Sequence, residues 1–478
     1  MKKRIIVPVV LATSLVFTGC GVGTEKNSNK ADTNNPVENN SITKGVSKEV
    51  AEYVDTIFSN VKANWPYIKN VWPKANYKDN NLLLFYTNSK GKVDKVWKIN
   101  TKEKKELKPQ EYKNITNPSV GGYKDLKFDG KKSIMLTINK EYIGMMQQTP
   151  PKIKQKFAKF NMTYTVATHE LFHYFYQPAE LKNELIQGTG NRSQEYPIAS
   201  EPRLYRKMLL LNLAEAYTNK SKQEEYLGKA KYWLEEWKAK DPVEAKNAQA
   251  VDFIEGQARY VEYLGEIASP SLTEKQKETA KKDILFYDKK KAFSAPDEEG
   301  YEIGFMGGIL LDRVKPGWKN NYFQNKQPIA DLLLQNIQPI KESVNTTVKK
   351  EVEKEINTQN QQSSKGMNAV DQFLSNKKIA ALKIPSSLQN GSYNVEGFYK
   401  YKNKDVILGF SASFESKTVG INVQNVNIIN MGDCYLIPLN EEYTLKDGEL
   451  TLNGGTLSGK AKSVQTANED GRTVLILQ

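Results

Sequence analysis

Hydrophobic positions near the start of the chain follow first a helical and then a strand-like spacing. Apolar residues from Val50 to Val61 recur at intervals of three and four, which predicts an amphipathic helix that starts near Ser47. Three runs rich in β-branched and aromatic residues then predict strands over 82–86, 93–99 and 133–138. This part of the chain therefore combines a helix with several strands.

The middle of the chain changes to helical periodicity after Pro150 and Pro151. A helix is predicted from Ile153 to Gln177, where Pro178 stops it. Four more helical patterns follow, over residues 202–218, 222–238, 242–266 and 274–288. A glycine-punctuated apolar stretch over 303–311 leads to a short helix predicted near 329–337.

The composition changes to Lys, Glu, Gln, Asn and Ser over residues 341–366, which indicates a solvated helix or a linker between domains. Residues 367–478 open with a short predicted helix and continue with β-rich runs separated by glycine turns. These runs cover residues 406–414, 419–429, 434–437 and 474–477. We therefore expect an α+β protein, with a domain over 45–340 whose second half is mostly helical and a small all-β domain over 367–478.

The first twenty residues predict a signal peptide rather than folded structure. A basic start is followed by an apolar run from Ile5 to Phe17, which is too short to span a bilayer. The end of this run, Phe17-Thr18-Gly19-Cys20, resembles the lipobox of bacterial lipoproteins, which implies cleavage before Cys20 and diacylation of its thiol. An ordinary secretory signal with an incidental cysteine is the alternative. The polar residues 21–44 predict a disordered tether. We therefore expect a lipid anchor at the extracytoplasmic face of a bacterial cell membrane.

Cysteine content limits the disulfides that the chain can form, and net charge limits the classes of binding partner. With Cys20 lipidated, no disulfide can form within the chain, and we expect Cys434 to be a small buried residue in a strand. The net charge of +14 reflects a lysine-rich composition. It indicates either attraction to anionic lipid or cell-wall polymer, or simply a solvated lysine surface. No arginine–aromatic stripe suggests nucleic acid, which we exclude as a partner.

The chain has only two histidines, and they stand four residues apart in His169-Glu170-Leu171-Phe172-His173. On a helix these positions face the same way, so both imidazoles can coordinate one Zn²⁺. Glu170 then lies on the neighbouring edge, close to a water on the metal, whose pKa zinc lowers to about 7. The string therefore indicates a zinc hydrolase; the alternatives are an incidental match on a structural helix and a degenerate, non-catalytic site.

A catalytic zinc site needs a third protein ligand, and no histidine remains to supply it. We expect a carboxylate on a later helix. Glu255 is one candidate, because Gly256 and Ala258 remove bulk beside it and would let its helix approach the HExxH helix closely. The other candidates are Glu201, Glu262, Glu215 and Glu195.

The string HELFH, followed downstream by Glu255-Gly256-Gln257-Ala258-Arg259-Tyr260, resembles the gluzincin peptidases, and specifically their peptidase MA-like group. The resemblance covers about residues 45 to 340 and implies a zincin-like catalytic domain. It implies His169, His173 and Glu255 as zinc ligands and Glu170 as the general base. It also implies that the strand over 133–138 is a sheet edge that binds an extended peptide. From its pattern alone, that strand could equally be a plain core strand.

Peptide hydrolysis also needs a donor for the oxyanion. The candidates that remain open are Tyr260, Tyr196, Arg203 and Arg259. The leading hypothesis is a membrane-anchored extracytoplasmic zinc metallopeptidase that acts on a peptide or protein substrate. One alternative is a non-catalytic surface-binding lipoprotein with a structural or vestigial zinc site. Another is a zinc amidase that acts on cell-wall peptides.

Overall fold

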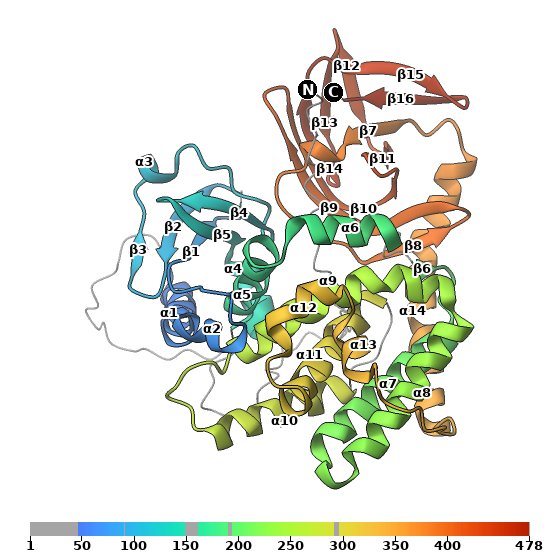
Figure 1. Cartoon of the computed structure of the whole chain (residues 1–478). Helices are drawn as coiled ribbons and strands as arrows, with labels where there is room; N and C mark the ends of the chain where they lie inside the picture. The colour runs from blue at the N-terminus through green and yellow to red at the C-terminus, as the bar shows by residue number, and fades with distance from the viewer. Residues whose placement is uncertain (1–45, 90, 149–160, 190–193, 291–295, 478) are drawn as a thin grey trace, which may run out of the picture.

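The computed structural model describes residues 46–89, 91–148, 161–189, 194–290 and 296–477. The predicted signal peptide, Cys20 and the tether lie outside these residues, as does the start of the helix predicted from Ile153. The described part is a mixed α+β fold whose C-terminal part is mostly strands, as the sequence predicts at this coarse level (Figure 1). None of its helices has the length and apolar character needed to cross a membrane.

A five-stranded sheet with the order β3-β2-β1-β5-β4 forms the N-terminal part. Its strands are β1 (Asn81–Thr87), β2 (Val93–Ile99), β3 (Lys104–Glu106), β4 (Tyr123–Phe128) and β5 (Lys131–Ile138). The helices and 3-10 turn beside it are α1 (Lys48–Asn64), Trp65–Tyr67, α2 (Ile68–Val71), α3 (Pro109–Tyr112) and α4 (Lys140–Gln148). Strand alternation buries Leu82 and Leu84 in the main core of the protein, while Leu83 and Phe85 fill a small cluster on the opposite face.

The strand predicted as a sheet edge is internal. β5 pairs in parallel with β1 and antiparallel with β4, so β4 forms the edge on that side of the sheet. The prediction of an edge over 133–138 is therefore wrong, because the short strand β4, which the hydrophobic pattern does not single out, adds outside it. Burial of Ile134 and Leu136 in the main core agrees with the alternative of a core strand.

Helices make up the middle of the chain, and several of them pack against the long helix over residues 242–265 (Figure 1). They are α5 (Met162–Phe175), α6 (Ala179–Thr189), α7 (Ser200–Thr218), α8 (Gln223–Lys240), α9 (Pro242–Gly265), α10 (Glu274–Lys290), α11 (Pro296–Val314), α12 (Tyr322–Asn325) and α13 (Ile329–Leu334). A two-residue strand, β6 (Gln194–Glu195), and 3-10 turns at Lys220–Lys222 and Trp318–Asn321 connect them. The glycine-punctuated stretch over 303–311 lies within α11.

Most of the segment predicted as a solvated helix or linker belongs to α14 (Thr346–Ser375), a helix of 30 residues. It runs through the boundary expected near residue 366 and replaces the short helix predicted after it. Val352, Ile356, Met367 and Val370 recur on one face at helical spacing and are buried in the main core. Long polar runs separate these buried residues, so the overall composition of the segment suggested a linker even though the apolar positions keep a helical spacing.

The C-terminal β unit, residues 376–477, holds most of the second sheet. Its strands are β7 (Ala381–Pro385), β8 (Gly397–Tyr401), β9 (Lys404–Glu415), β10 (Val419–Asn430), β11 (Cys434–Pro438), β12 (Tyr443–Lys446), β13 (Glu449–Asn453), β14 (Leu457–Ala461), β15 (Gln465–Glu469) and β16 (Arg472–Ile476), with a 3-10 turn at Ser386–Leu388. The main path is β12-β13-β14-β10-β11-β7-β16-β15, and β9 joins β10 to β8, which pairs with β6 of the helical part. Cys434 is a buried residue in β11, as predicted.

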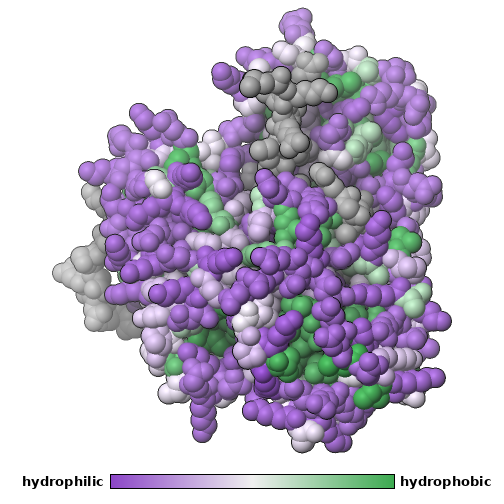
Figure 2. Space-filling model, in the orientation of Figure 1, coloured by the Kyte–Doolittle hydropathy of each residue, from purple (hydrophilic) through white to green (hydrophobic). Residues whose placement is uncertain are grey.

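The β unit rests against both other parts of the molecule (Figure 1). Tyr399 and Val406 of β8 and β9 belong to the main core together with the helices. A groove of about 740 Å³ lies between β9–β10 and the ends of β1 and β5, and its lining is mostly Ser, Thr and Asn. The face of the molecule drawn in Figure 2 is mostly hydrophilic.

Candidate metal centre

Helix α5 carries the HExxH string, and several buried polar contacts fix its position. Asn161 caps the helix, its side chain accepting a hydrogen bond from the backbone N–H of Tyr164 at 3.1 Å. The Trp65 indole donates to Thr168 Oγ1 at 3.0 Å, and the Tyr77 hydroxyl donates to the Thr168 carbonyl at 2.8 Å. The residue just before His169 is therefore tied to the N-terminal part of the fold.

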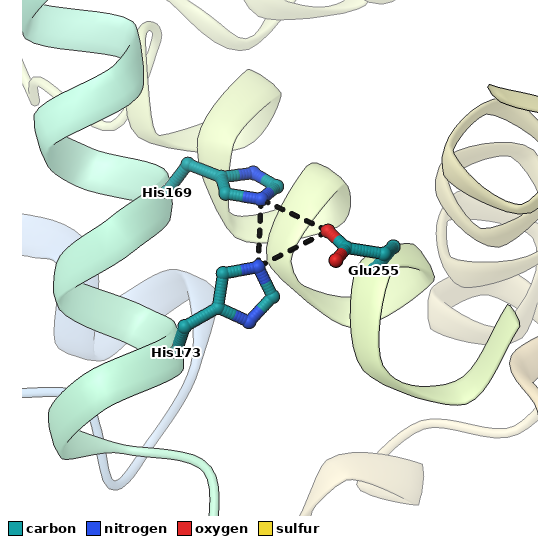
Figure 3. Close-up of side chains that lie close together, drawn as sticks. All are labelled: His169, His173 and Glu255. Carbon is teal, nitrogen blue, oxygen red and sulfur yellow. Dashed lines mark hydrogen bonds and ion pairs between the residues drawn. The ribbon is translucent and has the colours of Figure 1, made fainter. Parts of the chain in front are cut away.

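The structure brings His169, His173 and Glu255 together (Figure 3). The two histidine Nε2 atoms lie 2.8 Å apart, and Glu255 Oε2 lies 3.2 Å from His169 Nε2 and 3.1 Å from His173 Nε2. All three residues are buried, with at most 3% of their surface exposed. Glu255 is therefore the candidate carboxylate that faces the histidines, although 82 residues separate it from His173 in the chain.

The three side chains fit a metal ion. Their ligand atoms lie within 4.8 Å of one another. The two histidine–carboxylate separations are close to the edge of about 3.3 Å expected between ligands in a zinc tetrahedron, and the histidine–histidine separation is shorter. The second carboxylate oxygen, Glu255 Oε1, is buried and has no hydrogen-bond partner among the residues that the structure describes. Because a buried carboxylate oxygen without a partner is costly, this atom is a further acceptor that a cation could satisfy.

Gly256 faces a different neighbour from the one expected. A Cβ on Gly256 would lie 3.0 Å from Gly304 Cα and 3.3 Å from the Gly300 carbonyl, both on α11. Consecutive residues of a helix point about 100° apart, so Glu255 can face α5 while Gly256 faces α11. The expectation that Gly256 lets α9 approach the HExxH helix is therefore wrong: it lets α9 approach α11.

The Nδ1 atom of each histidine, on the ring side away from Glu255, contacts a residue that lies outside the ligand group. Glu262 Oε2 lies 2.8 Å from His169 Nδ1, which places this candidate in a supporting position rather than in the cluster. Gln177 Oε1 lies 2.8 Å from His173 Nδ1, and its amide donates to the Ile254 carbonyl at 2.7 Å. Such contacts set ring orientation and tautomer. Sequence reasoning missed Gln177, although its position four residues after His173 was a signal.

Tyr301 of α11 and Arg259 of α9 complete the wall behind His169. The Tyr301 ring stacks on the His169 imidazole with a centroid distance of 5.7 Å and an interplanar angle of 30°. Arg259 forms an ion pair with Glu262, and its guanidinium lies over the Tyr301 ring. No pattern in the sequence points to Tyr301, because only the packing of α11 against α9 brings it here.

Burial and mutual attraction oppose one another in the ligand group, and attraction decides the direction of the pKa shift at His169 and Glu255. Burial opposes protonation of His169, but hydrogen bonds with Glu255 and Glu262 outweigh it and raise its pKa to about 9. Burial lowers the pKa of His173. Burial also opposes ionisation of Glu255, yet the two histidines hold the pKa of its carboxyl well below the ordinary value. Glu255 is therefore ionised and available as a ligand, as metal coordination requires.

Glu170 lies on the neighbouring edge of α5 and is 1% exposed. Burial raises the pKa of its carboxyl to about 8, against the lowering effects of His169 and of a side-chain hydrogen bond with Tyr123. Lys182 of α6 also faces this region, and burial lowers the pKa of its ammonium group. Lys182 donates to the His173 carbonyl. Its place on the same helix as both histidines suits Glu170 to general acid–base work on a group held there.

The remaining candidate residues lie elsewhere, and several of them have partners there. Glu201 accepts a hydrogen bond from the Tyr205 hydroxyl, Glu195 lies in β6, and Glu215 lies on α7. The four candidate oxyanion donors are also engaged: Tyr260 with Asp312, Tyr196 with the Asn360 carbonyl, Arg203 with Glu244 and Arg259 with Glu262. The structure therefore does not bring these residues into the ligand group.

No protein-family model, curated protein or solved structure matches this chain. The geometry of the site is thus the main basis for a functional conclusion.

Proposed function

We propose that this protein is a zinc metallopeptidase with a zincin-like catalytic domain of the gluzincin type. The observation that carries the proposal is the buried His169–His173–Glu255 group with Glu170 on the same helix as the histidines. Two imidazoles and one carboxylate are the ligand set of many catalytic zinc sites, which leave a position open for water or substrate. We further propose that Cys20 anchors the protein by lipid at the extracytoplasmic face of a bacterial membrane.

Zinc held by these ligands would supply Lewis acidity and lower the pKa of a coordinated water to about 7. Glu170 accepts a proton from the water that attacks the peptide carbonyl. It then delivers that proton to the leaving nitrogen, so that water adds across the C–N bond and yields a carboxylic acid and an amine. Glu262 and Gln177 hold the two imidazoles in the orientation that leaves both Nε2 atoms facing Glu255.

The test compares three variants by bound zinc and by hydrolysis of a diverse peptide library. Glu170→Gln should retain zinc and lose about 10²- to 10⁴-fold in kcat, the usual contribution of a general acid–base group. Glu255→Ala should lose zinc. Glu201→Ala is the matched control, since Glu201 is exposed at the start of α7, and it should keep both properties.

Two results would contradict the proposal. The first is a wild-type protein that holds one zinc per chain yet cleaves no member of the library. The second is a Glu255→Ala variant that keeps its zinc, which would move the third ligand to another carboxylate.

A further inference from the structure

A loop of the C-terminal β unit, residues 390–392, is seated on the edge strand β4 at the strand's first residue. The backbone N–H of Tyr123 donates to Ser392 Oγ at 2.8 Å, and the backbone N–H of Ser392 donates to the Tyr123 carbonyl at 3.0 Å. Both outward-facing backbone groups of Tyr123 are therefore occupied, in the way that an added strand would occupy them.

The loop is held firmly from both sides. Asn390 accepts a hydrogen bond from Lys124 Nζ at 2.8 Å and donates to Glu415 of its own unit at 3.1 Å. Gly391 has a φ of +79°, and a Cβ there would lie 2.7 Å from Pro118 Cβ and 3.0 Å from the Tyr123 carbonyl. Only glycine combines this backbone conformation with so close an approach. Ser392 is 2% exposed.

The remaining length of β4 is short. In an antiparallel pair, the backbone groups of alternate residues face opposite sides. The Gly122 carbonyl accepts from Thr137 of β5, and Tyr123 faces outward, so Asp125 and Lys127 face outward as well. A peptide that adds to this edge beyond the loop can thus pair with the two outward-facing residues of β4. About four residues of the peptide would lie along this part of the strand.

The proposed base lies at the loop end of this strand. The Tyr123 side chain hydrogen-bonds to Glu170, and its ring packs against Tyr174 at a centroid distance of 6.5 Å. A peptide bond attacked beside Glu170 is therefore close to Tyr123. The substrate would extend along β4 in one direction and meet the loop over residues 390–392 in the other.

We propose that this loop makes the enzyme specific for chain ends: it accepts peptides that finish at the loop and releases only a short terminal piece. The inference rests on the proposed peptidase function and concerns the substrate class of that same site. The C-terminal β unit is then part of the substrate-binding region, with Asn390, Gly391 and Ser392 as its specificity-determining residues.

The test uses the full zinc-loaded protein and one peptide of about ten residues in four forms: both ends free, N-acetylated, C-amidated, and blocked at both ends. Cleavage should need one particular free end and should release a piece of one to three residues. The two singly blocked forms show which end meets the loop. Cleavage of the doubly blocked peptide at an internal bond, with unchanged kcat/KM, would overturn the inference while leaving the peptidase function intact. If the protein cleaves none of the four forms and no library peptide, both the inference and the proposed peptidase function are wrong.

A variant pair separates the loop from general effects. Asn390→Ala combined with Ser392→Ala removes the side-chain bonds to Lys124 and Tyr123 while keeping Gly391. It should raise cleavage of the doubly blocked peptide at least tenfold, with zinc content unchanged. Ser386→Ala is the control, since the Ser386 hydroxyl donates to the Asp433 carbonyl, within the β unit itself. Equal cleavage by both variants would refute the role of the loop; if the double variant fails to fold, the wild-type comparison of the four peptides still decides.

Discussion

Replacing Gly304 by alanine tests whether the contact between α9 and α11 positions the metal ligands. A Cβ at residue 304 would lie 2.2 Å from Gly256 Cα and 2.8 Å from the Gly256 carbonyl carbon. Ordinary van der Waals contact begins near 3.4 Å, so the added Cβ and Gly256 Cα must move about 1.2 Å apart to restore it. Both atoms belong to the backbone of α9, so rotation of a side chain cannot relieve the clash.

The cost should appear in stability and in metal binding together. Overpacking of this kind costs about 1–3 kcal/mol, and each kcal/mol corresponds to a decrease of about 2–4 °C in Tm for a unit of this size. Glu255 precedes Gly256 on α9, and metal–ligand distances tolerate changes of only about 0.2 Å. We therefore expect Gly304→Ala to weaken zinc binding by about tenfold or more, as well as to lower Tm.

Calorimetry and zinc titration of three glycine variants would measure this. Gly256→Ala, whose Cβ would approach Gly304 Cα to 3.0 Å, should have a smaller effect than Gly304→Ala. Gly144→Ala on α4 meets nothing within 4 Å and should be neutral or stabilising by about 0.5–1 kcal/mol. A Gly304→Ala protein with the Tm and zinc affinity of the wild type would refute the reasoning.

Two further predictions concern the surroundings of the site. Asn161→Ala, which removes the cap of α5, should lower the free energy of unfolding by about 1 kcal/mol and also weaken zinc binding. Asn345→Ala, which removes the cap of α14, should lower the free energy of unfolding by a similar amount without affecting zinc binding. Equal zinc affinities in the two variants would contradict this prediction. Burial raises the pKa of Tyr53 from 10.0 to about 12, so the folded state favours its neutral form and stability from this group is lost as pH rises from about 10 to about 12. In Tyr53→Phe, the free energy of unfolding measured with urea should therefore fall by about 2–3 kcal/mol less than in the wild type over that pH interval. An unchanged pH dependence would show that the group does not titrate as stated.

Local patterns were predicted well where a helix or strand carries its own signal. The helices from α7 to α10 begin and end within two residues of the predicted bounds, and β1 and β2 lie where the apolar runs indicated. The pattern was less informative for α14, whose buried residues are spread through a polar sequence, and for the short strand β4, which has little apolar periodicity. The weaker the apolar pattern of an element, the more its existence depended on its neighbours.

The spacing of His169 and His173 is sufficient by itself to place two imidazoles on one face, because helix geometry fixes the direction of residues four apart. The sequence therefore determined the two histidines and Glu170 as one candidate site. The third ligand, a carboxylate, is different, because Glu255, Glu262 and Glu201 are equivalent as residue types. Only the packing of α9 against α5 and α11 places Glu255 beside the histidines and Glu262 behind them. The edge strand and the loop that covers its start likewise follow from contacts between segments more than 260 residues apart, such as that of Tyr123 with Ser392, which no local pattern encodes.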